Sequence, residues 1–250
     1  MPTAVITGGA SGIGFAFANR WIREGGRVAI LDLSASAIES AIDSLGGPEV
    51  VLGLVANVKS DVEVQSAVAQ IAASTLGVID TVVNCAGVAR PAAAATVDDD
   101  EWTTLVDIHL NGTMRMNRAA FPFLAQSQRA SIVNLSSVAA ISGMPGRSSY
   151  CAAKAGVEGL TKALAVEWAE QGIRVNALAP GYVNSEMTAG LIASGSLKIQ
   201  PVIARTPLRR LAQPDEISAA IYFLASPESS YITGHTLYVD GGMTIDGSWY

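Results

Sequence analysis

The glycine-rich stretch Thr7–Gly14 is the feature that most limits which folds this chain can adopt. It reads Thr-Gly-Gly-Ala-Ser-Gly-Ile-Gly and follows the apolar run Ala4–Ile6, which has the composition of a buried strand. Helical patterning continues behind it over Phe15–Glu24. A glycine loop between a strand and a helix lets the backbone approach a pyrophosphate, whose charge the helix amino end stabilises. The stretch therefore predicts a dinucleotide-binding unit; the alternative is a tight turn that binds nothing.

Strand and helix patterns alternate along the rest of the chain. The further strands that we expect are Arg27–Asp32, Val50–Val55, Ile79–Asn84, Ser131–Leu135, Ile173–Leu178 and Thr236–Val239. The further helices that we expect are Ser34–Leu45, Ser60–Ser74, a helix from about 96 to 125, Ser149–Gln171, and a helix from 214 to about 224. Such alternation favours right-handed crossovers and a parallel sheet. The sequence thus predicts an α/β fold: a single domain over 1–250 with one Rossmann-like, doubly wound parallel β-sheet and helices on both faces.

Composition excludes several classes of function. Half of the 250 residues are hydrophobic and only 15% are charged, which suits buried parallel strands and a buried subunit interface. The net charge is −6 and no basic run occurs, so we expect neither nucleic acid nor a membrane surface as a partner. Cys85 and Cys151 form no C-x-x-C pair, which indicates a reducing compartment. With strand patterning from Thr3 onward and no visible signal peptide, we expect a cytoplasmic protein.

An acid stands at the carboxyl end of the second expected strand. Asp32 lies where a carboxylate can bind the ribose hydroxyls of NAD, and it would repel the 2′-phosphate of NADP. No arginine in the glycine loop or directly after Asp32 offsets that repulsion. NAD is therefore favoured over NADP as the cofactor. The alternative is that Asp32 simply caps the following helix.

A tyrosine and a lysine share one face of the expected helix Ser149–Gln171. Tyr150 and Lys154 are four residues apart, so the phenol and the ammonium lie one turn from each other. An ammonium favours the phenolate and lowers the tyrosine pKa, which allows proton exchange with an alcohol or ketone near neutral pH. Ser137, just after a strand, can hold the same oxygen atom. The alternative is a solvated pair on an exposed helix face.

Three other segments carry weaker signals. Thr96 can cap a helix whose first turn holds the acidic run Asp98–Glu101, and that helix is interrupted near His109–Gly112, where Asn and Gly are out of place. The interruption can expose backbone groups and hold water. The long segment 182–207 has weak periodicity and an apolar character, which predicts a substrate lid at about 184–207.

Together these residues resemble the short-chain dehydrogenase/reductase family, in its roughly 250-residue form. The matching features, in the family's order and spacing, are Thr7-Gly-x-x-x-Gly-x-Gly14, Asn84-x-Ala-Gly87, Asn111, Ser137, Tyr150-x-x-x-Lys154 and Pro180-Gly181. The resemblance implies that Tyr150 is the general acid/base and that Ser137 holds the substrate oxygen. It implies that Lys154 binds the nicotinamide ribose and that Asn111 completes a water-linked proton relay.

The resemblance also implies a cofactor site and an assembly. The implied cofactor-binding residues are Gly8, Ser11, Gly12, Ile13, Gly14, Asp32, Asn57, Val58, Asn84, Ala86, Gly87, Tyr150, Lys154, Pro180, Gly181 and Val183. Hydride transfer in the family needs no metal, and the chain has no zinc-ligand cluster: we interpret His109 and His235 as isolated surface or interface residues. The family is mostly tetrameric, so a homotetramer is expected, with Trp249 and Tyr250 as candidates to close a neighbour's pocket.

The sequence departs from the family pattern at two positions. Asn57 stands where an aspartate is usual, although its amide oxygen can still accept from the adenine amine. Cys85 replaces an asparagine, with no clear consequence, and Cys151 is expected to pack rather than react.

The expected function is NAD(H)-dependent oxidation of a secondary alcohol or reduction of a ketone. The lid is mostly apolar, which favours a neutral substrate, although Arg147 could anchor an anionic group. The alternatives are an NADPH-dependent 3-oxoacyl thioester reductase and a non-catalytic nucleotide-sensing protein on the same fold.

Overall fold

Seven parallel strands form one sheet in the computed structural model, which describes residues 1–75 and 77–247. Their order across the sheet is β3-β2-β1-β4-β5-β6-β7. The strands are β1 (Thr3–Thr7), β2 (Arg27–Asp32), β3 (Val51–Val55), β4 (Thr81–Asn84), β5 (Ser131–Leu135), β6 (Arg174–Pro180) and β7 (Thr236–Val239). The doubly wound parallel sheet predicted from the sequence is confirmed.

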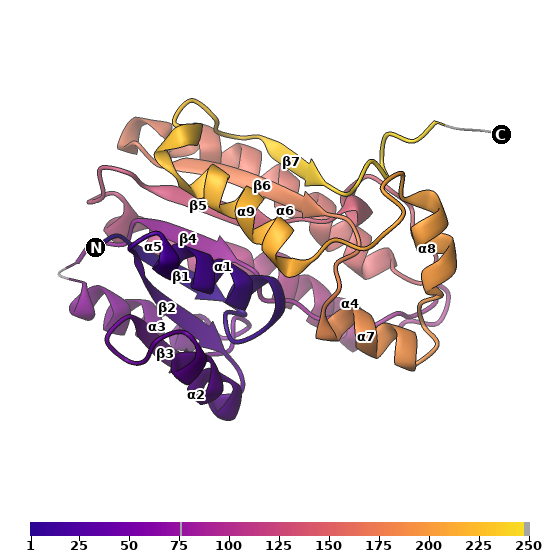
Figure 1. The fold of residues 1–250 in the computed structure, drawn as a ribbon, viewed down its shortest axis with the longest axis horizontal. Coiled ribbons are helices and arrows are strands. Elements are labelled where there is room, and N and C mark those ends of the chain that lie inside the picture. Colours follow the sequence, from indigo (N-terminus) through magenta and orange to yellow (C-terminus); the bar gives the residue numbers. More distant parts are fainter. Residues whose placement is uncertain (76, 248–250) are drawn as a thin grey trace.

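Helices cover both faces of the sheet, as Figure 1 shows. On one face lie α1 (Gly12–Arg23), α2 (Ala35–Ser44) and α9 (Pro214–Ala225); on the other lie α3 (Asp61–Ser74), α5 (Gly112–Leu124) and α6 (Ser148–Glu167), with α4 (Asp99–Val106) packed on α6. Although α1 and α9 are far apart in sequence, they lie side by side (Figure 1).

The two faces are built by alternate residues of each strand. In β1, Ala4 and Ile6 join the buried cluster that includes Phe17, whereas Val5 joins the opposite cluster with Ile71. Successive side chains of a strand point to opposite faces, so a strand covered on both sides must be apolar throughout. This two-sided cover explains why the strand segments of the sequence are near-continuous apolar runs.

The strand order reverses between β1 and β4. The chain leaves β1 toward one face and β4 toward the other, so the segments after these strands diverge at the carboxyl edge of the sheet. In open parallel sheets ligands bind in the crevice at this point. The fold thereby places Thr7–Gly14 next to the segment after Asn84.

Two helices start more than one residue away from the expected position. Helix α1 begins at Gly12, three residues before the expected start, because the glycine loop itself provides the first turn. The cap of α4 is Asp98 rather than Thr96: the Glu101 N–H donates to Asp98 Oδ1 at 2.7 Å. A carboxylate there satisfies a free N–H and also complements the helix dipole, which a threonine hydroxyl does less well.

The segment expected as a lid contains two helices that its weak periodicity did not predict. These are α7 (Glu186–Ala193) and α8 (Ile199–Arg205), which lie together beyond one end of the sheet (Figure 1). The expectation for Trp249 and Tyr250 falls outside the described residues. Of the helices in the described ranges, none combines the length and apolar character needed to cross a bilayer.

Candidate active site

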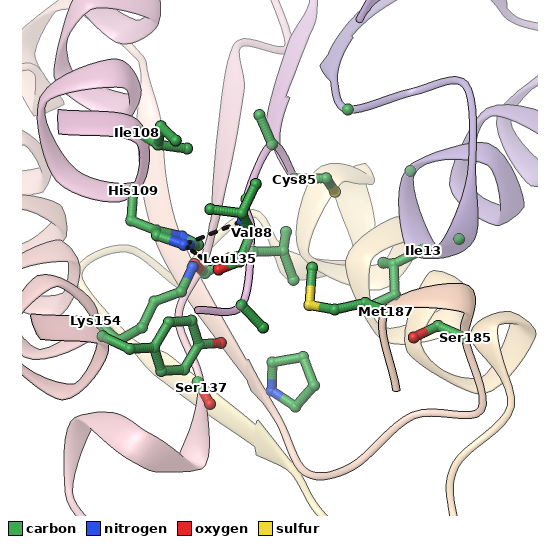
Figure 2. A pocket seen from close by; sticks show the side chains of 18 of the residues that line it. Ile13, Cys85, Val88, Ile108, His109, Leu135, Ser137, Lys154, Ser185 and Met187 are labelled. Atoms are coloured by element: carbon green, nitrogen blue, oxygen red, sulfur yellow. Dashed lines mark hydrogen bonds between the residues drawn. The ribbon is translucent and has the colours of Figure 1, made fainter. Parts of the chain in front are cut away.

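A cavity of about 580 Å³ opens at the carboxyl edge of the sheet. It is lined by the glycine loop, by the segments that follow β2, β3, β4, β5 and β6, by part of the segment 104–109, by the amino-terminal part of α6, and by α7. Figure 2 shows side chains from these separate segments converging, with Lys154 and His109 on one side and Ile13 and Met187 on the other. The fold thus assembles one cleft from residues spread over most of the sequence.

The glycine loop leaves room for the backbone to approach a ligand. Gly8 has φ +66°, a left-handed conformation that favours glycine, and a Cβ there would lie 2.9 Å from the Ala86 Cα. A Cβ on Gly14 would lie 2.2 Å from the Gly8 carbonyl oxygen. Side chains at these positions would therefore clash. Because glycine has none, the loop and the start of α1 can pack this closely.

The amino end of α1 also differs from those of its neighbours. Ser34 and Ser60 cap α2 and α3, each accepting a backbone N–H through its hydroxyl. Ser11 caps α1 by position, but its side chain makes no capping hydrogen bond. The first-turn N–H groups of α1 stay available at the cleft, and helix amino ends stabilise anions. These residues fit the pyrophosphate of a dinucleotide.

Asp32 lies at the edge of the same cleft. Its Oδ2 accepts the Ala10 N–H at 3.3 Å and its Oδ1 accepts the Leu33 N–H at 2.8 Å, so the carboxylate is held by backbone from both sides. Within the described part of the chain Asp32 forms no salt bridge. Such a fixed, unpaired carboxylate suits a pair of ribose hydroxyls.

Asn57 and Val58 line the cleft beside Asp32. The Asn57 side-chain oxygen accepts the Lys59 N–H at 3.0 Å, and the Asn57 N–H donates to Glu63 Oε2 at 2.9 Å. Asn57 is therefore oriented by its own turn, and its oxygen keeps a second lone pair for another donor.

Asn84 does not line the cleft. It is 5% exposed, and its amide donates to Asn117 Oδ1 at 2.7 Å and to Asn134 Oδ1 at 2.9 Å. Asn134 in turn donates to Thr161 Oγ1 at 3.0 Å. This buried network joins β4, α5, β5 and α6, so Asn84 ties together the elements that carry the site.

Ser137 and Tyr150 meet inside the cleft. Ser137 follows β5, is 9% exposed, and accepts the Ala139 N–H at 3.1 Å. Burial raises the pKa of Tyr150 above its ordinary value, while a hydrogen bond with Ser137 and the nearby charge of Arg147 lower it. The contact between the two hydroxyls places both where one substrate oxygen can reach them.

Lys154 is buried beside this pair, with 6% of its surface exposed. Its Nζ donates to the Leu135 carbonyl at 2.6 Å and lies 5.7 Å from the centroid of the Tyr150 ring (Figure 2). Burial lowers the pKa of Lys154 to about 8, against an opposing effect of Cys85. We expected Lys154 to lower the pKa of Tyr150, but Lys154 is not among the groups that shift it, and burial dominates.

The interpretation of His109 as a surface or interface residue is wrong. His109 is 3% exposed and lines the cleft, with its ring edge-on to Tyr150 at 5.1 Å between centroids. The predicted interruption of the helix near this point is confirmed: Asp107–Asn111 forms a π-helical turn. That turn directs His109 inward and leaves Asn111 exposed, where its amide donates to Asp107 Oδ1 at 3.0 Å.

Most of the residues predicted for the site do come together. Those that line the cleft are Gly8, Ser11, Gly12, Ile13, Gly14, Asp32, Asn57, Val58, Ala86, Gly87, Ser137, Tyr150, Lys154, Pro180, Gly181 and Val183. Asn84 and Asn111 lie outside the lining. The sequence reasoning missed His109 as a lining residue, whereas Met187 and Leu191, which also line the cleft, belong to the segment predicted as a lid. The burial of His109 could have been predicted only by assuming that the interruption of the helix turns the side chains near it toward a different face.

No group of three or more His, Cys, Asp or Glu side chains in the described ranges is placed to hold a metal ion. Cys85 and Cys151 are free thiols. Burial raises the pKa of Cys85 to about 12, which outweighs the opposing charge of Lys154. Cys85 therefore stays a protonated, unreactive thiol beside the cleft.

Comparison with known proteins agrees with this geometry. Residues 8–244 match the family described as "Enoyl-(Acyl carrier protein) reductase". The chain is 37% identical to the 3-oxoacyl-[acyl-carrier-protein] reductase FabG of Thermotoga maritima, over 96% of this chain and 97% of that one. It is 38% identical to the galactitol 2-dehydrogenase (L-tagatose-forming) of Cereibacter sphaeroides, over 97% and 94%. The crystal structure of levodione reductase superposes with a TM-score of 0.91 at 29% identity, covering 97% of both chains.

The fold, the cleft and these similarities define an oxidoreductase on a Rossmann-like sheet. The chain belongs to the short-chain dehydrogenase/reductase family.

Proposed function

We propose that the protein is an NAD(H)-dependent oxidoreductase that interconverts a secondary alcohol and a ketone. The observation that carries the proposal is the meeting of Ser137, Tyr150 and Lys154 in the cleft that holds the glycine loop. The similarity to a galactitol 2-dehydrogenase supports a secondary alcohol as substrate. When bound, the nicotinamide cofactor supplies the hydride chemistry, and the glycine loop, Asp32 and the segments after β4 and β6 are the residues that would hold it.

Side chains of the protein would carry out the proton transfer and would position the substrate. In oxidation, Tyr150 takes the proton of the substrate hydroxyl; in reduction, it returns a proton to the ketone oxygen. Ser137 donates a hydrogen bond to the same oxygen and so fixes its position. Lys154 supplies a buried positive charge, 5.7 Å from the centroid of the Tyr150 ring, which would stabilise negative charge that develops on the substrate oxygen.

Asp32 is the proposed determinant of cofactor choice. Its carboxylate is fixed by two backbone N–H groups and has no salt-bridge partner among the described residues. It can accept from both ribose hydroxyls of NAD, while a 2′-phosphate at the same place would meet an uncompensated negative charge.

Cofactor titration tests this assignment. Purified protein is titrated with NADH and NADPH, and we expect tighter binding of NADH. Asp32→Ala should weaken NADH binding by about 10- to 100-fold, the range for hydrogen bonds to a charged group, and should narrow the gap to NADPH. Glu39→Ala, which removes an exposed acid of α2 outside the cleft, is the matched control and should change neither affinity. Equal or tighter NADPH binding by the unaltered protein would reject Asp32 as the determinant.

The second candidate is a 3-oxoacyl thioester reductase that uses NADPH. The similarity to FabG favours it. The same titration separates the two, because a preference for NADPH, together with turnover of a 3-oxoacyl thioester, would move this candidate to first place.

We also propose that residues 184–207 act as a lid and that the protein assembles as a homotetramer. Ser185, Met187 and Leu191 of this segment line the cleft, which supports the lid.

The proposed homotetramer has a different basis. Exposed apolar side chains on α4 and α6, Trp102 at 37% and Val166 at 81%, support burial between subunits. Light scattering of the purified protein measures the assembly, and a monomeric mass would exclude the tetramer.

A further inference from the structure

A half-buried arginine lines the cleft beside the tyrosine. Arg147 directly precedes α6, and Tyr150 stands three positions on, the spacing at which side chains along a helix become neighbours. Both residues line the same cavity. Burial raises the pKa of Tyr150, and the charge of Arg147 opposes that effect, so the guanidinium acts on the phenol. None of the roles assigned above uses this cation.

The backbone holds Arg147 in place from two sides. The Ala92 N–H donates to the Gly146 carbonyl at 2.9 Å, and a parallel bridge pairs Ala92 with Arg147. Gly146 has φ +70°, a left-handed conformation that glycine adopts readily. On the other side, the Cys151 N–H of the first turn of α6 donates to the Arg147 carbonyl at 2.9 Å. The arginine is therefore tied to the segment after β4 and to α6, which lowers the ordering cost of binding a ligand.

The guanidinium of Arg147 has no carboxylate to neutralise it. Arg115, Arg118 and Arg210 each form a salt bridge with an acid, at 2.6–2.8 Å. Arg147 forms none within the described ranges of the chain. A charge that is partly removed from water and left unpaired attracts an anion more strongly than a charge on an open surface. The cleft thus offers a cation to a ligand rather than to another side chain.

Positive charge predominates at the end of the cleft that holds Tyr150. Arg147 and Lys154 lie there, and the exposed Arg90, from the segment that bridges to Arg147, also lines the cavity. Among the described lining residues the acids are Asp32, for which we propose the cofactor ribose, and the exposed Glu186 of α7. Glu186 is the group that could compete with a ligand for Arg147, so the tests below include it.

Apolar side chains make up much of the remaining lining. Val88, Val138, Met144 and Leu191 reach the cavity from four separate segments. Such surroundings suit a short carbon skeleton and limit the access of water, so an ion pair with hydrogen bonds is stronger there than in bulk water. The planar fork of an arginine matches the two oxygens of a carboxylate or the edge of a similar oxoanion.

We propose that Arg147 recognises an anionic group of the substrate, a carboxylate or a similar oxoanion, so that the protein acts on a small ketone or secondary alcohol that carries such a group. The inference rests on the proposed function, because it names the substrate class of the same site. The reacting oxygen lies at Ser137 and Tyr150, and the anionic group lies at Arg147. This assignment replaces the neutral substrate that the apolar character of the lid favoured.

The first test measures binding and needs no turnover. Butyrate and butyramide have nearly the same size, differ in charge, and contain no ketone to reduce. Ligand-observed NMR gives both dissociation constants for protein saturated with the dinucleotide that binds more tightly in the titration above. We expect butyrate to bind about 10- to 100-fold more tightly, the range for hydrogen bonds to a charged group. Arg147→Met should remove the difference.

Butyrate that binds no more tightly than butyramide to the unaltered protein would overturn the proposal, even if the protein reduces neutral ketones. Conversely, a preference for butyrate that depends on Arg147 would support the anion site even if no ketone is turned over. The outcome for the anion site is therefore separate from the outcome for the proposed oxidoreductase activity.

The second test compares kcat/KM for acids and esters. The substrates are 3-oxobutanoate and 4-oxopentanoate, which differ in the spacing of the two groups, each with its methyl ester. We expect the acid to exceed its ester in at least one pair, and Arg147→Met to lower that acid-to-ester ratio by about 10- to 100-fold. The ratio is the quantity to compare, because loss of the Arg147 charge also changes the pKa of Tyr150 and affects both substrates alike.

Two further variants sharpen this comparison. Arg147→Lys keeps the charge but loses the planar fork, so it should keep part of the preference for the acid. Arg23→Met removes an exposed arginine outside the cleft and should leave the ratio unchanged. A ratio that Arg147→Met does not move would contradict the proposal. Equal losses for acid and ester in both Arg147→Met and Glu186→Gln would indicate that these two side chains pair with each other, which also contradicts it.

Discussion

The cleft has two walls that are held in different ways. One wall, for which we propose the catalytic role and which we call the catalytic wall, is formed by His109, Ser137, Tyr150 and Lys154. Three of its side chains are 9% exposed or less. The proposed lid, residues 184–207, forms the other wall, with Met187 at 46% and Ile192 nearby at 39% exposed. Proton transfer needs groups fixed to within a fraction of an ångström, whereas a lid must move to admit substrate. Substitutions in the wall should therefore change chemistry and stability, and those in the lid should change substrate binding.

The largest effect is expected on turnover at the catalytic wall. Tyr150→Phe removes the group that exchanges a proton and should lower kcat by about 10³-fold, within the range for general acid–base catalysis. The ring and its packing against His109 remain, so NADH affinity should change less than about threefold. Steady-state rates and a cofactor titration measure the two quantities. Undiminished turnover in this variant would remove Tyr150 from the mechanism.

The next effect is an acid sensitivity that originates in the same wall. His109 titrates near 6.5 when unfolded, and burial together with the charge of Lys154 lowers its pKa to about 3 in the fold. Below about pH 6.5 His109 is protonated in the unfolded chain but not in the folded chain. The contribution of His109 to the free energy of unfolding is therefore lost as pH falls from about 6.5 toward 3. Between pH 7 and pH 4 the loss from His109 should be about 3 kcal/mol.

Urea unfolding at fixed protein concentration from pH 7 to pH 4 measures this loss. His109→Asn should show a shallower dependence on pH than the unaltered protein. His235→Asn is the matched control, because His235 is exposed and its loss should leave the slope unchanged. Equal slopes for all three proteins would show that folding does not lower the pKa of His109.

The smallest effect is expected in the lid. Met187→Ala removes a half-exposed side chain that lines the cleft, so it should change KM by less than about tenfold and the free energy of unfolding by less than about 0.5 kcal/mol. Ile192→Ala, on the same helix but outside the cleft lining, should leave KM unchanged. A large loss of kcat in Met187→Ala would show that the lid takes part in the chemistry, and the contrast between the walls would fail.

Much of the cofactor half of the site could be predicted because its signals are local. The Thr7–Gly14 loop, Asp32 at a strand end, and the four-residue spacing of Tyr150 and Lys154 each follow from backbone geometry within one or two elements. The helices α7 and α8 could not be predicted. The apolar residues of α7 face both the cleft and the solvent, and α8 has only seven residues, so neither gives a clean period.

The amino-acid sequence by itself determined the parallel sheet, the glycine loop and the placing of Tyr150 and Lys154 on one helix face. Tertiary structure alone decided that His109 lines the cleft while Asn111 stays outside it, since one π-helical turn changes which side chain points inward. It also decided that Asn84 binds a buried amide network and that burial raises the pKa of Tyr150. The physical reason is common to these cases: spacing along a regular element follows from local backbone rules, whereas burial and pairing depend on what distant segments place alongside.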